Sequence, residues 1–251
     1  MEQFEVTRIG PPMHLFGYDI SFTNSALWMC IVAGSAALLL TIGASSRRLV
    51  PTRLQSIAEM SYVFVADMIR SASGTDGLRF FPFVFTLFFF VLFANLYGLF
   101  PLGLFPFIHP FTVTSHIVVT FALAIFVFLM VIVIGIARHG FKFFGIFAPS
   151  VPLPMLIILI PIEVVSFCSR PISLSVRLFA NMLAGHTMLN VFGGFVIGLA
   201  AAGGAVSILS VAPLVAITAV AALEFLIAFL QAYVFAMLAC IYLNDAIHPG
   251  H

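Results

Sequence analysis

The chain has 251 residues, of which 63% are hydrophobic and only 8% are charged. Soluble domains carry about 25% charged residues, so this composition excludes a soluble fold and predicts an all-α polytopic membrane protein with a single membrane domain over residues 1–251. The formal net charge of +1 leaves no basic patch for binding nucleic acid.

The first predicted spanning helix covers residues 25–44, which contain no charged residue. About 20 apolar residues suffice to cross a bilayer as a helix. Arg47, Arg48 and Arg53 follow it directly, and positive residues collect on the inner side of membranes. We therefore expect the N-terminal segment, residues 1–24, to lie outside. We also expect the first helix, rather than a cleavable leader, to direct insertion.

Residues 54–73 are too polar to span, and they predict an amphipathic helix that lies along the inner surface. Gln55, Glu59, Asp67 and Arg70 fall within about 120° of arc on a helical wheel, with apolar residues opposite. Such a helix is typical of a membrane interface.

Residues 80–137 predict a transmembrane hairpin. Its two apolar runs, 80–100 and 116–137, are separated by a proline-containing loop without lysine or arginine, as expected for an outer loop. Arg138 and Lys142 follow the second run and again indicate the inner side.

The last hundred residues, 149–246, predict two long tilted helices packed as an antiparallel pair. Each apolar stretch is about 40 residues long, so as a helix it would measure roughly 60 Å, twice the hydrocarbon thickness. Such helices must break or tilt, and Pro161, Pro171 and Pro213 allow kinks. A glycine-rich turn separates the two stretches.

These two helices carry the ionisable residues that lie within predicted membrane spans. Ionisable groups inside a membrane are costly and are therefore functional candidates. The candidates are Glu163, Arg170, Arg177, His186 and Glu224, with Asn181 and Gln231 as polar companions.

Helical periodicity divides the candidates between faces. On an unbroken helix Arg177 and Asn181 lie close together, whereas His186, nine residues after Arg177, points to the opposite side. Glu224 and Gln231 are seven residues apart and share a face of the second helix. Antiparallel packing could therefore bring His186 and Glu224 into one polar site that exchanges protons.

Less specific interpretations remain open at this point. Glu163 and Arg170 share a face and can pair at one end of their helix, or Arg170 only anchors the chain near Pro171. His186 taken alone is also compatible with an ordinary buried histidine. Arg177 is harder to explain in this way, because its charge is permanent and requires water or an acid from another chain.

The sequence predicts no metal and no cofactor. The three cysteines are isolated, the seven histidines are scattered, and no HExxH motif is present, which argues against an intramembrane metalloenzyme or haem protein. A secondary ion transporter with an Arg/His/Glu site at the membrane midplane is an alternative. It would be expected to show symmetric halves, and the two halves of this chain differ.

Two segments carry a resemblance to a known family. The run SRPISLSVRLFANMLAGH (169–186) and the later LEFLIAFLQAYVFAMLACIYLNDA (223–246) resemble subunit a of the rotary F-type ATP synthases. PPMHLFGYDISFTNS and LFANLYGLFP also resemble that family, so the likeness covers essentially the whole chain.

The resemblance implies a stator subunit that forms two proton half-channels against a ring of c subunits, each with a carboxylate in mid-membrane. Arg177 matches the essential arginine that faces these carboxylates, and Asn181 and Gln231 match its polar neighbours. His186 and Glu224 match the pair that lines a half-channel. Their order is reversed relative to many bacterial members, as is typical of mitochondrial-like ones.

Further expectations follow from the same resemblance. Glu163 matches a carboxylate near the proton path. The partners would be the c-ring, b-type peripheral stalk subunits, other ATP synthase subunits, protons, channel water and the lipid bilayer. The location would be a bacterial inner membrane or, as second choice, the mitochondrial inner membrane. The chain itself would make no covalent bond, so its role would be ion conduction.

Overall fold

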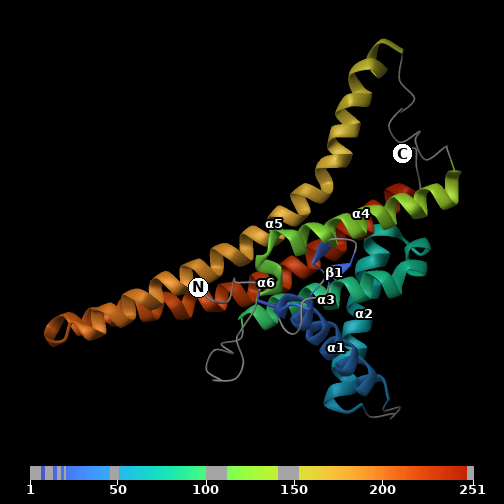
Figure 1. Ribbon diagram of the computed structural model, residues 1–251. Coiled ribbons are helices and arrows are strands. Elements are labelled where there is room, and N and C mark those ends of the chain that lie inside the picture. The colour runs from blue at the N-terminus through green and yellow to red at the C-terminus, as the bar shows by residue number, and fades with distance from the viewer. Residues whose placement is uncertain are drawn as a thin grey trace.

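The computed structural model describes residues 7–8, 14–15, 18–19, 21–45, 51–99, 112–140 and 153–247. Helices α2 to α5 pack against α6 (Val211–Ile247), whereas α1 packs on α2 and α3. The pair formed by α5 (Leu153–Ala201) and α6 extends away from the other helices (Figure 1). In chain order the elements are β1 (His14–Leu15), β2 (Tyr18–Asp19), α1 (Asn24–Ser45), α2 (Arg53–Ser73), η2 (Asp76–Phe80), α3 (Phe81–Leu99), η4 (Val113–Ser115), α4 (Ile117–His139), α5 (Leu153–Ala201), η6 (Gly204–Ser210) and α6 (Val211–Ile247).

The predicted fold class, an all-α polytopic membrane protein, is confirmed. Within the described ranges, five helical segments are long and apolar enough to cross a membrane: Asn24–Ser45, Asp76–Leu99, Ile117–His139, Met155–Ala201 and Val206–Ile247. The two strands form one antiparallel pair of two residues each, which leaves the helical class unchanged.

Several sequence predictions concern residues outside the described ranges. They are the inner-side positive residues Arg47, Arg48 and Lys142, most of the N-terminal segment 1–24, the outer loop at 101–111 and the first residues of the long helix pair at 149–152. The orientation of the chain in the membrane therefore stays a prediction.

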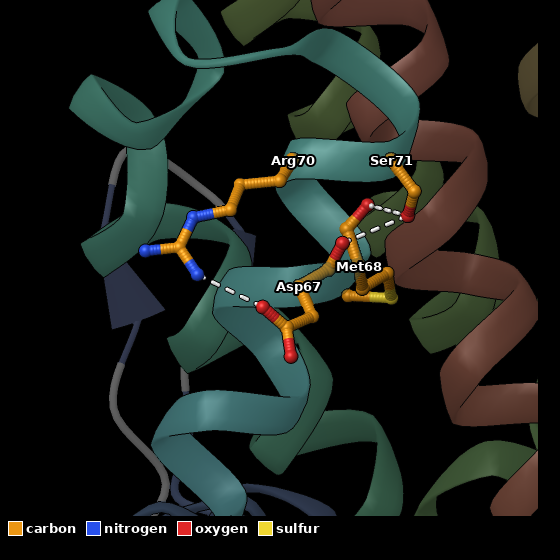
Figure 2. A network of polar contacts seen from close by, with 4 residues as sticks. All are labelled: Asp67, Met68, Arg70 and Ser71. Atoms are coloured by element: carbon orange, nitrogen blue, oxygen red, sulfur yellow. Dashed lines mark hydrogen bonds and ion pairs between the residues drawn. The ribbon is translucent and has the colours of Figure 1, made fainter.

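Helix α2 is amphipathic, and its exposed side chains Asp67, Arg70 and Ser71 make polar contacts within the helix. Thr52 caps its N-terminus by accepting a hydrogen bond from the Gln55 amide at 3.3 Å. Figure 2 shows the exposed side near its other end, where Arg70 pairs with Asp67 at 2.9 Å and Ser71 donates to main-chain carbonyls of the preceding turn. These contacts let the opposite side of α2 pack on α6.

The core lies where α2, α3, α4 and α5 meet α6. Helix α6 presents a row of small residues to its neighbours, and small residues let membrane helices approach closely. This row comprises Ala228, Ala232, Ala236 and Ala239. Buried side chains from the surrounding helices pack in the same core, among them Val65, Ile69, Val84, Val91, Val127, Leu174 and Leu178.

Helices α5 and α6 form the long antiparallel pair. Helix α5 has 49 residues and would measure about 70 Å if straight. It contains Pro161 and Pro171, and Figure 1 shows that it bends part-way along. The turn into η6 uses Gly203 and Gly204, both with positive φ, which glycine adopts without strain. No described residue between 187 and 223 is buried, so lipid or a partner must cover this end of the pair.

Candidate functional site

Helix α5 presents two different faces at the centre of the pair. Arg177 and Asn181 are exposed, one turn apart, whereas His186 is only 6% exposed. This division agrees with helical periodicity, because nine residues advance a helix by about two and a half turns. One polar group therefore faces out of the subunit while another faces its interior.

Asn181 and Gln231 connect α5 to α6. Asn181 donates from Nδ2 to Oε1 of Gln231 at 3.1 Å. Gln231 is buried, and among the described residues its own Nε2 has no hydrogen-bond partner. The two amides thus place a polar bridge next to Arg177, which the sequence did not predict as a direct contact.

Glu224 lies buried on the same face of α6 as Gln231. It is 6% exposed, and neither of its carboxylate oxygens has a hydrogen-bond partner in the part of the chain that the structure describes. Its carboxylate packs against Gly185 of α5, where glycine, having no side chain, leaves room for it. A buried carboxylate without such a bond is costly, which favours a functional role.

His186 follows Gly185 directly, so the structure brings the predicted pair, His186 and Glu224, to one place without a hydrogen bond between them. The imidazole Nε2 lies 3.4 Å from Oγ1 of Thr112, at hydrogen-bonding distance. Gly98 of α3 adjoins both groups, since a Cβ there would lie 2.7 Å from Thr112 Cγ2 and 3.5 Å from His186 Nε2. The site is therefore closed by α3 and by the residues before α4.

Sequence reasoning missed several buried polar residues around this site. Asn95 of α3 is fully buried and donates to the carbonyl of Ala228 on α6 at 3.3 Å, and its Oδ1 has no partner among the described residues. Thr112, Thr114 and Ser115 are also buried, next to the start of α4. The sequence signal for these residues is the polar run TVTS (112–115), which lies at the end of the predicted outer loop, just before the apolar run that starts at His116.

Arg170 corrects one interpretation from the sequence. Its partner is Asp245 near the end of α6, at 2.9 Å, and not Glu163. The guanidinium also lies over the rings of Tyr242 and Phe167, at 4.8 and 5.4 Å from their centroids. Helical spacing cannot find this contact, because Arg170 and Asp245 belong to different helices. The partly buried Glu163 forms no ion pair within the described ranges.

The chemistry available at this site is proton exchange beside a fixed charge. An imidazole and a carboxylate can each bind and release a proton, whereas a guanidinium stays protonated. Among the described residues, no group of three or more His, Cys, Asp or Glu side chains could hold a metal ion.

The fold and the site define a multi-pass membrane protein with ionisable groups inside its helix bundle, the class to which ion-translocating subunits belong. More particularly, the chain belongs to the family described as ATP synthase A chain, whose model matches residues 26–244.

Individual relatives agree over the full length. The chain is 57% identical to ATP synthase subunit a of Mesorhizobium japonicum, covering 100% of this chain and 97% of the relative. It is 55% identical to that of Maricaulis maris and 56% identical to that of Chelativorans sp., covering 100% of this chain and 98% of each relative. Family membership associates the chain with ATP synthesis, proton transport and other ATP synthase subunits.

Proposed function

We propose that this chain forms two proton half-channels against a ring of c subunits and couples proton translocation to ring rotation and ATP synthesis. Its other partners would be b-type peripheral stalk subunits and lipid. It would reside in the inner membrane of a bacterium with its N-terminus outside, and the mitochondrial inner membrane is the second choice. Family membership and the five apolar helices support this proposal.

The observation that carries the proposal is the environment of Arg177. Its side chain is exposed on a membrane-spanning helix, and within the described residues it makes no hydrogen bond or ion pair. A permanent charge on a membrane surface is costly unless an opposite charge or water reaches it. A carboxylate on a passing ring subunit would supply that charge transiently, as rotation requires.

The remaining site residues take different roles in this proposal. Asn181 and Gln231 would hold the surface around Arg177 through their cross-helix bond. His186 and Glu224 would accept and pass protons inside one half-channel, since both are buried titratable groups and His186 lies 3.4 Å from the Thr112 hydroxyl. Glu163, partly buried nearer the start of α5, would lie near the proton path.

Replacing Arg177 tests the proposal. In sealed membrane vesicles that contain the complete ATP synthase, Arg177→Ala should abolish ATP synthesis driven by a proton gradient while the complex still assembles. Arg70→Ala is the matched control, because Arg70 is an exposed arginine on α2 with a local partner, Asp67. Normal synthesis by the Arg177→Ala complex would disprove the proposed role of this residue.

A further inference from the structure

Two arginines on α5, seven residues apart, have opposite electrostatic environments. Arg170 is paired with Asp245 at 2.9 Å, and its side chain is 22% exposed. The rings of Tyr242 and Phe167 flank its guanidinium, and such cation–π contacts stabilise a partly desolvated charge. Arg177 is exposed and has no comparable partner within the described part of the chain.

The two charges are close enough to act on the same ion. Seven helical residues separate their Cα atoms by about 10 Å along α5. Two charges at that distance still interact appreciably in the low-dielectric surroundings of a membrane. Without compensation, Arg170 would therefore add a second positive potential at the place where Arg177 acts.

We infer that Asp245 is a positioning residue that neutralises Arg170, so that Arg177 is the single uncompensated positive charge that this stretch of α5 presents to the ring carboxylate. The inference rests on the proposed function, because it requires a carboxylate that passes Arg177. It assigns a role to a residue at the end of α6 that pairs with Arg170.

Charge compensation explains the position of Asp245 better than a role in holding the end of α6 in place. The carboxylate is 40% exposed, so the pair contributes little to stability through its attraction alone. Other contacts already hold this end of α6: Ser73 of α2 donates to the carbonyl of Cys240 at 2.8 Å, and His139 of α4 donates to the carbonyl of Ile247 at 2.8 Å. Charge compensation is what the pair adds.

Other charged or titratable groups occur on the elements packed against this pair, and any pH effect must be separated from them. Within the described ranges, neither Arg170 nor Asp245 forms an ion pair with any of them. They are Glu163, Cys168, Arg177 and His186 on α5, Glu224, Tyr233, Cys240 and Tyr242 on α6, Arg138 and His139 on α4, Arg53, Glu59, Tyr62, Asp67 and Arg70 on α2, Asp76 and Arg79 on η2, and Tyr97 on α3.

The test uses the complete ATP synthase in sealed vesicles and four variants: Asp245→Asn, Asp245→Glu, Arg170→Gln and the double variant of Asp245→Asn with Arg170→Gln. ATP synthesis is measured against pH on the side from which protons enter, with the pH difference across the membrane held constant. In Asp245→Asn, the additional positive charge favours the ionised ring carboxylate, so the half-maximal rate should move to more acidic pH, by about half a unit.

The other three variants have different expected profiles. Arg170→Gln leaves Asp245 uncompensated, so its profile should move to less acidic pH. The double variant is neutral at this position, and its profile should return to that of the wild type. Asp245→Glu retains the charge and should also keep the wild-type profile.

A purely structural pair would give a different pattern. Both single variants would then lower the rate without shifting the profile in opposite directions, and the double variant would be no better than either; this result overturns the inference. If Asp245→Asn fails to assemble, the direction of the shift in Arg170→Gln decides alone. If Arg177→Ala abolishes synthesis but the pH profiles of the Asp245 and Arg170 variants do not shift, the role of Asp245 is rejected and the proposed role of Arg177 stands.

Discussion

The carboxylate of Glu224 on α6 occupies the space above Gly185 on α5 that a side chain would fill. A Cβ built on Gly185 would lie 2.6 Å from Cδ of Glu224 and 3.0 Å from its Cγ. Gly185 lies within a regular helix, so no unusual backbone conformation requires a glycine at this position. The position requires a glycine because any side chain would collide with Glu224. The close approach places the buried acid against Gly185, the residue that precedes His186.

Gly185→Ala should displace this carboxylate. We expect proton-driven ATP synthesis to fall by roughly tenfold or more, because a misplacement of about 1 Å can cost about 100-fold in rate. The measurement is the synthesis rate in vesicles, normalised to the amount of assembled complex. Gly198→Ala on the same helix is the control, since nothing lies within 4 Å of a Cβ there. Equal activity of the two variants would contradict the packing argument.

The hydrogen bond between Asn181 and Gln231 should appear as a coupling energy. Asn181→Ala and Gln231→Ala should each slow synthesis, and the double variant should lose less than the sum of the two, with a coupling of about 1 kcal/mol. The energies are calculated from the ratios of synthesis rates. Asn190→Ala replaces an exposed asparagine on the same helix and should have little effect. Additive losses in the double variant would show that the bond makes no contribution.

Ser73→Ala should weaken the attachment of α2 to α6. The variant loses the buried bond from Ser73 Oγ to the carbonyl of Cys240, which typically contributes about 1 kcal/mol. The thermal unfolding temperature of the detergent-solubilised complex should fall relative to Ser71→Ala, whose hydroxyl donates only within its own helix (Figure 2). The same unfolding temperature for both variants would argue against this attachment.

His116, just before α4, should make stability depend on pH. Burial lowers the pKa of His116 below its usual value of 6.5. The unfolded chain therefore binds a proton at higher pH than the folded chain, and stability should fall as the pH drops below 6.5. The unfolding temperature measured from pH 7 to pH 5 should decline less in His116→Gln than in the wild type. A steeper decline in the variant would reverse the expected sign.

The sequence was most informative where a pattern repeats along one helix. Apolar runs of sufficient length identified the helices that can span a membrane, and the amphipathic pattern identified α2. The opposite directions of Arg177 and His186 also follow from helical periodicity alone, and the exposed and buried side chains agree with it. Such inferences succeed because the geometry of a single helix depends only on local spacing.

The sequence was least informative about contacts between helices. The pairing of Arg170 with Glu163, one of the interpretations that the sequence left open, is not the one in the structure: Asp245, 75 residues away, pairs with Arg170 across α5 and α6. Asn95 and Thr112 were likewise missed, since their burial beside α6 and His186 depends on how α3 and η4 pack. Their polarity is visible in the sequence, but their neighbours are not.

By itself the sequence determined the membrane class, the long helices and the two faces of α5, because hydrophobicity and helical periodicity are properties of one segment. Only the tertiary structure decided which acid neutralises Arg170, which residue makes room for Glu224 and which amide joins α5 to α6. Those outcomes depend on the register of two antiparallel helices. A shift of one residue rotates every side chain by about 100° and would bring different partners together.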